Sequence, residues 1–210
     1  LTDVTGVQTC ALPILANLPT DPDHPMVKAF IERVLPSHAS TRERVNILPR
    51  FFHECLAELG EVGSVLDIAS GLNPLCIPWM PLKPGFTYTA CDIYSDMVEF
   101  LNAFFHHFGI SGSALVADVT RSVPQVEAEV AFVLKTIPCL EQLDKNAGRT
   151  ILAGIAAPNV LVSFPARSLG GRSKGMVQFY EQHFRDLTKD QSWQITRVEF
   201  PGELAFLIRK

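Results

Sequence analysis

The amino-acid sequence predicts an α/β fold, in which helices wrap a mainly parallel sheet that ends in a C-terminal antiparallel hairpin. The chain has 210 residues, of which 47% are hydrophobic, and this suits about one ordinary domain. Beyond Gly63, short β-rich runs alternate with longer helical ones. The last two β-rich runs, residues 194–200 and 204–209, are separated by only three residues. A gap that short allows a hairpin and forbids a crossover helix.

The first 37 residues are predicted to be an N-terminal remnant, helical from about residue 26, and residues 38–210 to be the main domain. Residues 3–14, DVTGVQTCALPI, resemble a translated sequencing-adapter read joined to a gene fragment. A partly artefactual origin of this segment is therefore left open, and no function is inferred from residues 1–20. Residues 26–35 carry apolar side chains at helical spacing and are expected to form an amphipathic helix.

A second helix is predicted to start at Ser40 or Thr41 and to end at Gly60. Ser40 and Glu43 have the spacing of a capping box, in which each side chain bonds a free backbone N–H of the first turn. Pro49 is tolerated in such a helix only as a kink.

Five strands are expected before the hairpin, at residues 64–69, 88–93, 114–118, 130–134 and 160–164. Helices are expected at residues 96–108, 141–155 and 176–189. Parallel strands followed by a terminal hairpin are the arrangement of Rossmann-like class I S-adenosylmethionine (SAM)-dependent methyltransferases, whereas many dinucleotide-binding folds continue parallel.

Composition excludes several classes of protein. The five cysteines form no C-x-x-C pair and lie mostly in apolar runs, which predicts reduced, buried thiols and a cytoplasmic protein. No apolar run approaches the roughly 20 residues that span a bilayer, so no membrane partner is expected. No His/Cys spacing suits zinc, and no metal is predicted.

The run VLDIASGLNP, residues 65–74, places D-x-x-x-G at the end of an apolar strand. Ligands of open α/β sheets bind at this edge. Asp67 can hold a polar or cationic ligand group there, Gly71 lets a ligand approach the backbone, and Ala69 lies between them. A single glycine disfavours a pyrophosphate cradle, which would need three. Taken alone, the run also fits an ordinary strand-to-loop turn.

Two further acids end the next two predicted strands. Asp92 stands where a carboxylate would accept both hydroxyls of a ribose. Asp118, followed by Val119, stands where a carboxylate can receive an adenine amino group. Each Asp singly could form a turn, but these two together with Asp67 are three acids in register, and they predict a nucleoside site.

Two cations are also candidates. Lys135 interrupts an apolar run at the end of the fourth strand, where it either serves function or reaches water along the sheet rim. Arg44, near the start of the second helix, either binds the SAM carboxylate or lies on a solvated helix face.

Charge is divided unevenly along the chain. Residues 1–144 hold 8 Lys/Arg and 17 Asp/Glu, a net charge of −9, whereas residues 145–210 hold 10 and 5, a net charge of +5. The basic part contains a glycine-rich loop after the fifth strand, with Arg167, Arg172 and Lys174. Glycines leave backbone amides accessible and cations neutralise phosphates, so this loop predicts phosphate or RNA contact.

Four runs together are similar to one known family: HASTRER (38–44), VLDIASGLNPL (65–75), CDI (91–93) and SFPARSLGGRSKGM (163–176). They resemble the aminoglycoside-resistance 16S rRNA methyltransferases, and more narrowly the branch that methylates guanine N7 in the ribosomal decoding site. The resemblance covers about residues 36–210. Three departures are Ser70 where relatives usually have Cys, Ser173 where some have Gly, and an N-terminal region shorter than the family's helical docking region.

The resemblance implies a monomeric enzyme that transfers a methyl group from SAM to guanine N7 of 16S rRNA within the 30S subunit. The residues that it places beside SAM are Arg44, Gly71, Asp92, Asp118 and Lys135. Arg167, Arg172 and Lys174 are implied on the RNA side. Lys135 is the candidate catalytic residue, as a positioning group rather than a base.

Two other functions are left open by the residues. One is a truncated RNA- or SAM-binding module that does not methylate. The other is a nicotinamide-dependent oxidoreductase, which the glycine pattern and the terminal hairpin disfavour.

Overall fold

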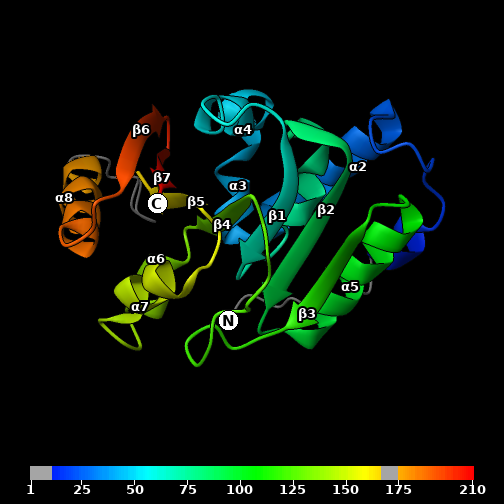
Figure 1. Ribbon diagram of the computed structural model, residues 1–210. Helices are drawn as coiled ribbons and strands as arrows, with labels where there is room; N and C mark the ends of the chain where they lie inside the picture. Colours follow the sequence, from blue (N-terminus) through cyan, green and yellow to red (C-terminus); the bar gives the residue numbers. More distant parts are fainter. Residues whose placement is uncertain (1–10, 167–174) are drawn as a thin grey trace.

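The computed structural model describes residues 11–166 and 175–210. The strands in these ranges form a single mixed sheet (Figure 1). Its strands are β1 (Val62–Ile68), β2 (Leu82–Asp92), β3 (Gly112–Val116), β4 (Val130–Leu134), β5 (Asn159–Pro165), β6 (Gln194–Phe200) and β7 (Glu203–Arg209). Their order across the sheet is β3-β2-β1-β4-β5-β7-β6. The first five are parallel, and β7 is antiparallel to both β5 and β6. The predicted parallel sheet with a C-terminal hairpin is therefore confirmed.

Helices cover both faces of this sheet. They are α2 (Pro25–Val34), α3 (Ala39–Arg42), α4 (Leu48–Cys55), α5 (Ser95–His107), α6 (Ile137–Leu140), α7 (Ala147–Gly154) and α8 (Met176–Thr188). The buried side chains of β4 alternate between the two faces, as the period of two of a strand requires. Phe132 joins the core that includes α2, α4 and α5, whereas Ala131 and Val133 join the core that includes α7 and α8. Burial on both sides explains why β4 reads as an unbroken apolar run.

The second predicted helix is wrong as a continuous element. The segment divides into α3, a 3₁₀ turn at Val45–Ile47 and α4. Pro49 lies in the first turn of α4, where a proline needs no N–H partner, so it starts a helix instead of kinking one. The capping box is also absent here, since His38 is the N-cap of α3 and Ser40 Oγ bonds the His38 ring at 2.8 Å.

Three other elements differ from the sequence prediction. Of the helix expected at 141–155 only α7 forms, since α6 ends before residue 141 and Asp144 lies in a turn in which its carboxylate accepts from the N–H of Asn146 at 2.9 Å. β2 begins six residues early, at Leu82, in a half-exposed stretch whose Pro84 and Gly85 hide the strand pattern. A 3₁₀ segment at Asn73–Trp79, which periodicity did not indicate, follows β1.

Helical structure also precedes residue 26. Residues 11–15 form a helical turn, and Ala11 and Leu15 are buried in the core that includes α5. The carbonyl of Leu18 contacts His107 Nε2, on α5, at 3.1 Å. Across the described ranges, no helix combines the length and the apolar character needed to cross a membrane.

Candidate functional site

A pocket of about 390 Å³ lies at the carboxyl ends of the parallel strands. The strand order reverses here, because β2 and β3 lie on one side of β1 whereas β4 and β5 lie on the other. Open α/β sheets bind ligands at this reversal. Four predicted site residues line the pocket: Ala69, Asp92, Asp118 and Val119. Apolar side chains of Ile93, Leu140 and Leu143 line it as well, which suits a flat ring flanked by polar groups.

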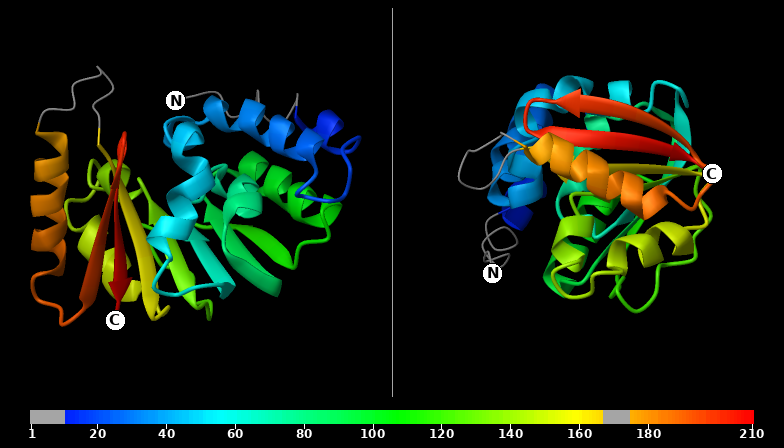
Figure 2. Two further views of the ribbon diagram at one scale, coloured as in Figure 1. Left: turned by 90° about the horizontal axis from the view of Figure 1, so that it is seen from above. Right: turned by 90° about the vertical axis from the view of Figure 1, so that its left-hand side faces the viewer.

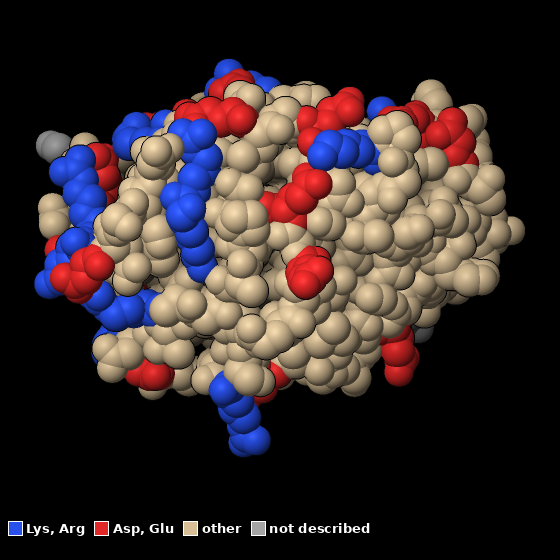
Figure 3. All heavy atoms as spheres, viewed as in Figure 1, with Lys and Arg blue, Asp and Glu red and all other residues tan. Residues whose placement is uncertain are grey.

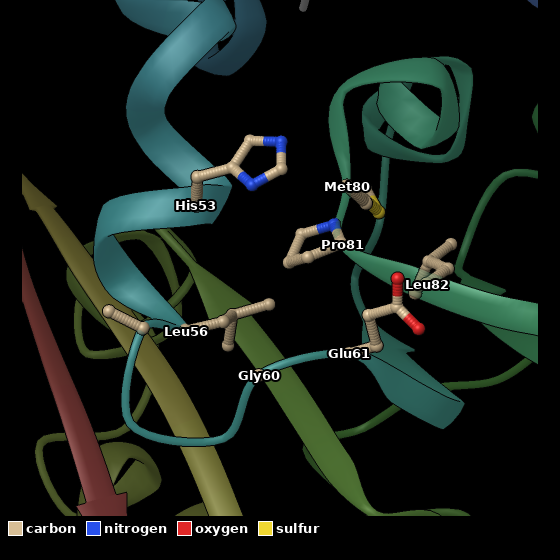
Figure 4. Close-up of a pocket in the computed structure, with 8 residues that line it drawn as sticks. His53, Leu56, Gly60, Glu61, Met80, Pro81 and Leu82 are labelled. Atoms are coloured by element: carbon tan, nitrogen blue, oxygen red, sulfur yellow. The ribbon is translucent and has the colours of Figure 1, made fainter.

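Another hollow, of about 450 Å³, lies at the opposite edge of the sheet (Figure 4). It is lined by His53 of α4 and by Glu61, Pro81 and Leu82, which stand at the starts of β1 and β2. Since parallel sheets bind ligands at the carboxyl edge, the first pocket is the candidate site.

Asp92 is held in place by backbone donors. Its Oδ2 accepts from Gly71 N at 2.9 Å and its Oδ1 accepts from Tyr94 N at 3.2 Å, while the residue is buried. A carboxylate oxygen has two acceptor positions, so both oxygens keep capacity for a ligand hydroxyl each. The predicted ribose acceptor is therefore oriented before any ligand arrives.

Unusual backbone angles gather at the same edge. Ala69 and Lys135 directly follow the adjacent strands β1 and β4 and have φ of +50° and +57°. These are the two non-glycine residues with positive φ in the described part of the chain. Strain of this kind costs on the order of 1–3 kcal/mol per residue and is found preferentially at functional sites. Gly71 shares this conformation at φ +50°, and a Cβ there would stand 2.9 Å from His38 Cε1.

Asp118 lies two residues beyond the end of β3, on the rim of the pocket. Its Oδ1 accepts from both the N–H and the hydroxyl of Thr120, and these bonds lower the pKa of Asp118. The carboxylate is therefore charged at neutral pH and available to a donor such as an amino group.

Asp67 lies buried near the pocket and does not line it. Its Oδ2 accepts from Tyr88 Oη at 2.7 Å and from Asn73 Nδ2 at 2.8 Å. Its Oδ1 is buried without a hydrogen-bond partner. Burial raises the pKa of Asp67 to about 6, against the lowering effect of those two hydrogen bonds.

Arg44 does not line the pocket either. It is 2% exposed, and its guanidinium donates to Glu203, with Nη2–Oε1 at 2.6 Å, and to Asn73 Oδ1 at 2.7 Å. The guanidinium also lies 4.5 Å from the ring centroid of Phe51. The solvated helix face that the sequence left open is thus excluded, and contact with a ligand carboxylate stays a prediction.

Lys135 joins the same buried cluster. Its Nζ lies 2.7 Å from Glu43 Oε2, 3.3 Å from Glu203 Oε2 and 3.2 Å from the Ser40 carbonyl. Glu203 therefore bridges Arg44 and Lys135. Sequence reasoning missed Glu203, although a glutamate heading the apolar strand ELAFLIR was a usable signal.

The raised pKa of Asp67 predicts a pH-dependent stability. Because the folded-state pKa lies above the ordinary value of 3.8, this residue's contribution to stability is present below pH ~4 and is lost as pH rises through ~6. The quantity to compare is the free energy of unfolding of Asp67→Asn minus that of wild type. We expect this difference to increase by about 1–2 kcal/mol when the pH is raised from about 5 to about 7.5. Urea unfolding of both proteins at the two pH values measures this, and an unchanged difference would contradict the assignment.

The charge split of the sequence is visible on the surface. Figure 3 shows Lys and Arg gathered over α8 and the C-terminal hairpin, whereas the part over α5 and β3 is mostly uncharged. Several cations of residues 145–210 are paired, with Arg149 on Asp190 and Arg197 on Glu181 and Glu199. The predicted RNA-contacting residues Arg167, Arg172 and Lys174 lie outside the described residues. Within the described ranges, no group of three or more His, Cys, Asp and Glu is placed to hold a metal ion.

Comparison with known proteins matches this chain to a family. The family model "Ribosomal RNA methyltransferase (FmrO)" matches residues 2–207. The 16S rRNA (guanine(1405)-N(7))-methyltransferase of Micromonospora echinospora is 35% identical over 188 residues, which cover 90% of this chain and 69% of that protein. The protein of the same name from Frankia casuarinae is 38% identical over 191 residues, covering 90% and 66%.

Two solved structures share the fold. The 16S rRNA methyltransferase RmtF, in complex with S-adenosyl-L-homocysteine, superposes with a TM-score of 0.81 at 28% identity, covering 98% of this chain and 76% of that one. The 16S rRNA methylase ArmA superposes with a TM-score of 0.69 at 29% identity, covering 85% and 90%. Both likenesses extend over most of this chain.

Proposed function

Because this chain belongs to the ribosomal RNA methyltransferase (FmrO) family, we propose that it transfers a methyl group from SAM to N7 of a guanine in the decoding site of 16S rRNA, and thereby confers aminoglycoside resistance. The observation that carries the proposal is the pocket at the strand reversal, with Asp92 and Asp118 at the ends of neighbouring strands. Relatives that match 90% of the chain bear the name of this activity.

The pocket residues fit SAM. Asp92 keeps two acceptor positions for the ribose hydroxyls, Asp118 is a charged acceptor on the rim, and the apolar side chains of Ile93 and Leu140 suit the adenine faces. Outside the pocket lining, Asp67 Oδ1 and Ser70 Oγ, in the segment that leads to Gly71, are buried without a hydrogen-bond partner. We assign Arg44 and Lys135 a positioning role. Both contact Glu203, and these contacts hold this edge of the sheet in place.

Methyl transfer to guanine N7 depends on the relative positions of the reacting groups and not on proton transfer. Bound SAM supplies an electrophilic methyl group on a sulfonium. Guanine N7 has an in-plane lone pair and no proton to lose, so methylation there needs no general base. Lys135 suits a positioning role and not that of a base, because contacts with Glu43 and Glu203 hold its Nζ in place.

The partner that we propose is 16S rRNA within the 30S subunit, bound by a monomer in the cytoplasm without a metal ion. The glycine-rich basic loop supports this, since Arg167, Arg172 and Lys174 can neutralise phosphates. The target guanine lies inside folded RNA and must leave its stack to reach the pocket.

Incubation with 30S subunits and methyl-labelled SAM tests the proposal. We expect label in 16S rRNA, at a guanine N7 identified by strand scission at the modified base. SAM binding by calorimetry without label transfer would instead support a truncated binding module. Binding of NAD without SAM would favour an oxidoreductase.

Arg172→Ala separates the RNA side from the cofactor side. We expect SAM affinity within about twofold of wild type and a fall in methylation of 30S subunits of roughly tenfold, because one phosphate-neutralising cation is lost. Calorimetry and label transfer measure the two effects, and the loss should diminish as salt is raised. A fall in SAM affinity as large as that of a pocket variant would refute the division.

A further inference from the structure

The first turn of α8 stands at the same edge of the sheet as the candidate pocket. β5 runs parallel to β1 and β4 and ends at Pro165, and α8 begins at Met176 (Figure 2). Phe179 is the fourth residue of this helix and is 60% exposed. Single exposed apolar residues are common, so what distinguishes Phe179 is its place at a ligand-binding edge beside other aromatic rings.

The Phe179 ring is fixed by other aromatic rings. It lies nearly parallel to the His183 ring, with centroids 6.2 Å apart and planes at 8°, and edge-on to Tyr180 at 5.1 Å. Tyr180 stacks on the buried Phe164 of β5 at 5.0 Å. His183 Nε2 contacts Glu141 Oε2 at 2.7 Å, which joins this group of rings to the end of α6. The Phe179 ring thus has aromatic neighbours on its own helix, while most of its surface stays exposed.

This group of rings contacts the segment that lines the candidate pocket. Glu141 directly follows Leu140, and both Leu140 and Cys139 line the pocket. Burial raises the pKa of Tyr180, and the charges of nearby Cys139 and Glu141 raise it further. Phe179 is therefore connected to the segment that lines the pocket through His183 and Glu141.

We propose that Phe179 is a stacking surface for an unstacked nucleobase of the substrate RNA. This inference rests on the proposed function and adds a residue to it. Every base has a π-face, and exposed aromatic rings are a means by which proteins hold single-stranded bases. Gly175, the N-cap of α8, closes the glycine-rich run that carries Arg167, Arg172 and Lys174, so phosphate-neutralising cations precede the ring in sequence.

Substitutions at Phe179 test the proposal in the full chain. Phe179→Ala should weaken 30S binding, measured by cosedimentation, roughly 5- to 150-fold, the loss found when one base–aromatic stack is removed. Phe179→Trp should bind as well as wild type, and Phe179→Leu should bind nearly as weakly as alanine, because it keeps apolar area without a π-face. SAM affinity and melting temperature should stay unchanged in all three.

Ile195→Ala is the matched control. Ile195 is an exposed apolar residue, 42% accessible, near the start of β6, and β6 starts at the opposite edge of the sheet. Its loss should leave 30S binding unaltered. Phe179→Ala binding within twofold of wild type would overturn the proposal, and so would Phe179→Leu binding like wild type, which would indicate a protein contact. Absence of label transfer by wild type would refute the proposed function separately, since cosedimentation does not depend on catalysis.

Discussion

Replacing Glu203 by alanine is expected to lower the free energy of unfolding by about 3–5 kcal/mol, because two buried cations then lose their shared counter-charge. Glu203 is fully buried and contacts both Arg44 and Lys135. Burial alone would raise the pKa of Glu203, but the facing cations hold it below its ordinary value. The carboxylate is thus charged at neutral pH, and its contribution to stability is lost only as pH falls through that lowered pKa.

Urea unfolding at neutral pH measures this effect. Glu199→Ala is the control, since Glu199 lies on the same hairpin and its partner Arg197 is exposed, so its loss should cost less than about 1 kcal/mol. Glu203→Gln should fall between the two, because it keeps hydrogen bonds and loses the charge. Equal stability of Glu203→Ala and wild type would refute the bridging role.

Asp92→Ala is expected to weaken SAM binding roughly 100-fold or more, since two hydrogen bonds from ribose hydroxyls to a charged acceptor are lost. The substitution also removes the acceptor of Gly71 N and of Tyr94 N, which order the pocket wall. Isothermal calorimetry with SAM measures the change, and melting temperature reports whether the fold is kept.

Asp96→Ala supplies the comparison for Asp92. Asp96 is an acid four residues on, in the first turn of α5, and it is not among the pocket-lining residues. Its loss should leave SAM affinity within about twofold of wild type, whereas Asp92→Asn, which keeps one acceptor oxygen, should fall between them. Comparable SAM affinities for Asp92→Ala and Asp96→Ala would remove Asp92 from the cofactor site.

Much of the candidate site could be predicted from local sequence. Asp92 and Asp118 each follow a β-rich run, and parallel strands bring their carboxyl ends to one edge. The structure accordingly places both in one pocket with Ala69 and Val119. Asp67 and Gly71 were located at the right edge, but which of them faces a ligand depends on side-chain packing that no periodicity records.

The helices were predicted less well. A single pattern of apolar residues from 45 to 59 fits one helix, yet the segment divides before Pro49. Ser40 and Glu43 match a capping box, but their side chains bond His38 and Lys135 instead. In both cases a partner distant in sequence or a turn competes with the local preference and wins.

By itself, then, the sequence determined the succession of strands along the chain, the terminal hairpin and the acids at the carboxyl edge. Strand period, loop length and strand-end position are local properties, which is why they could be predicted. Only the tertiary structure decided that Arg44 is buried and that Glu203, 159 residues away, joins it to Lys135. A buried charge requires a counter-charge, but any of the chain's carboxylates could have supplied it. Packing of β7 against β5 selected Glu203.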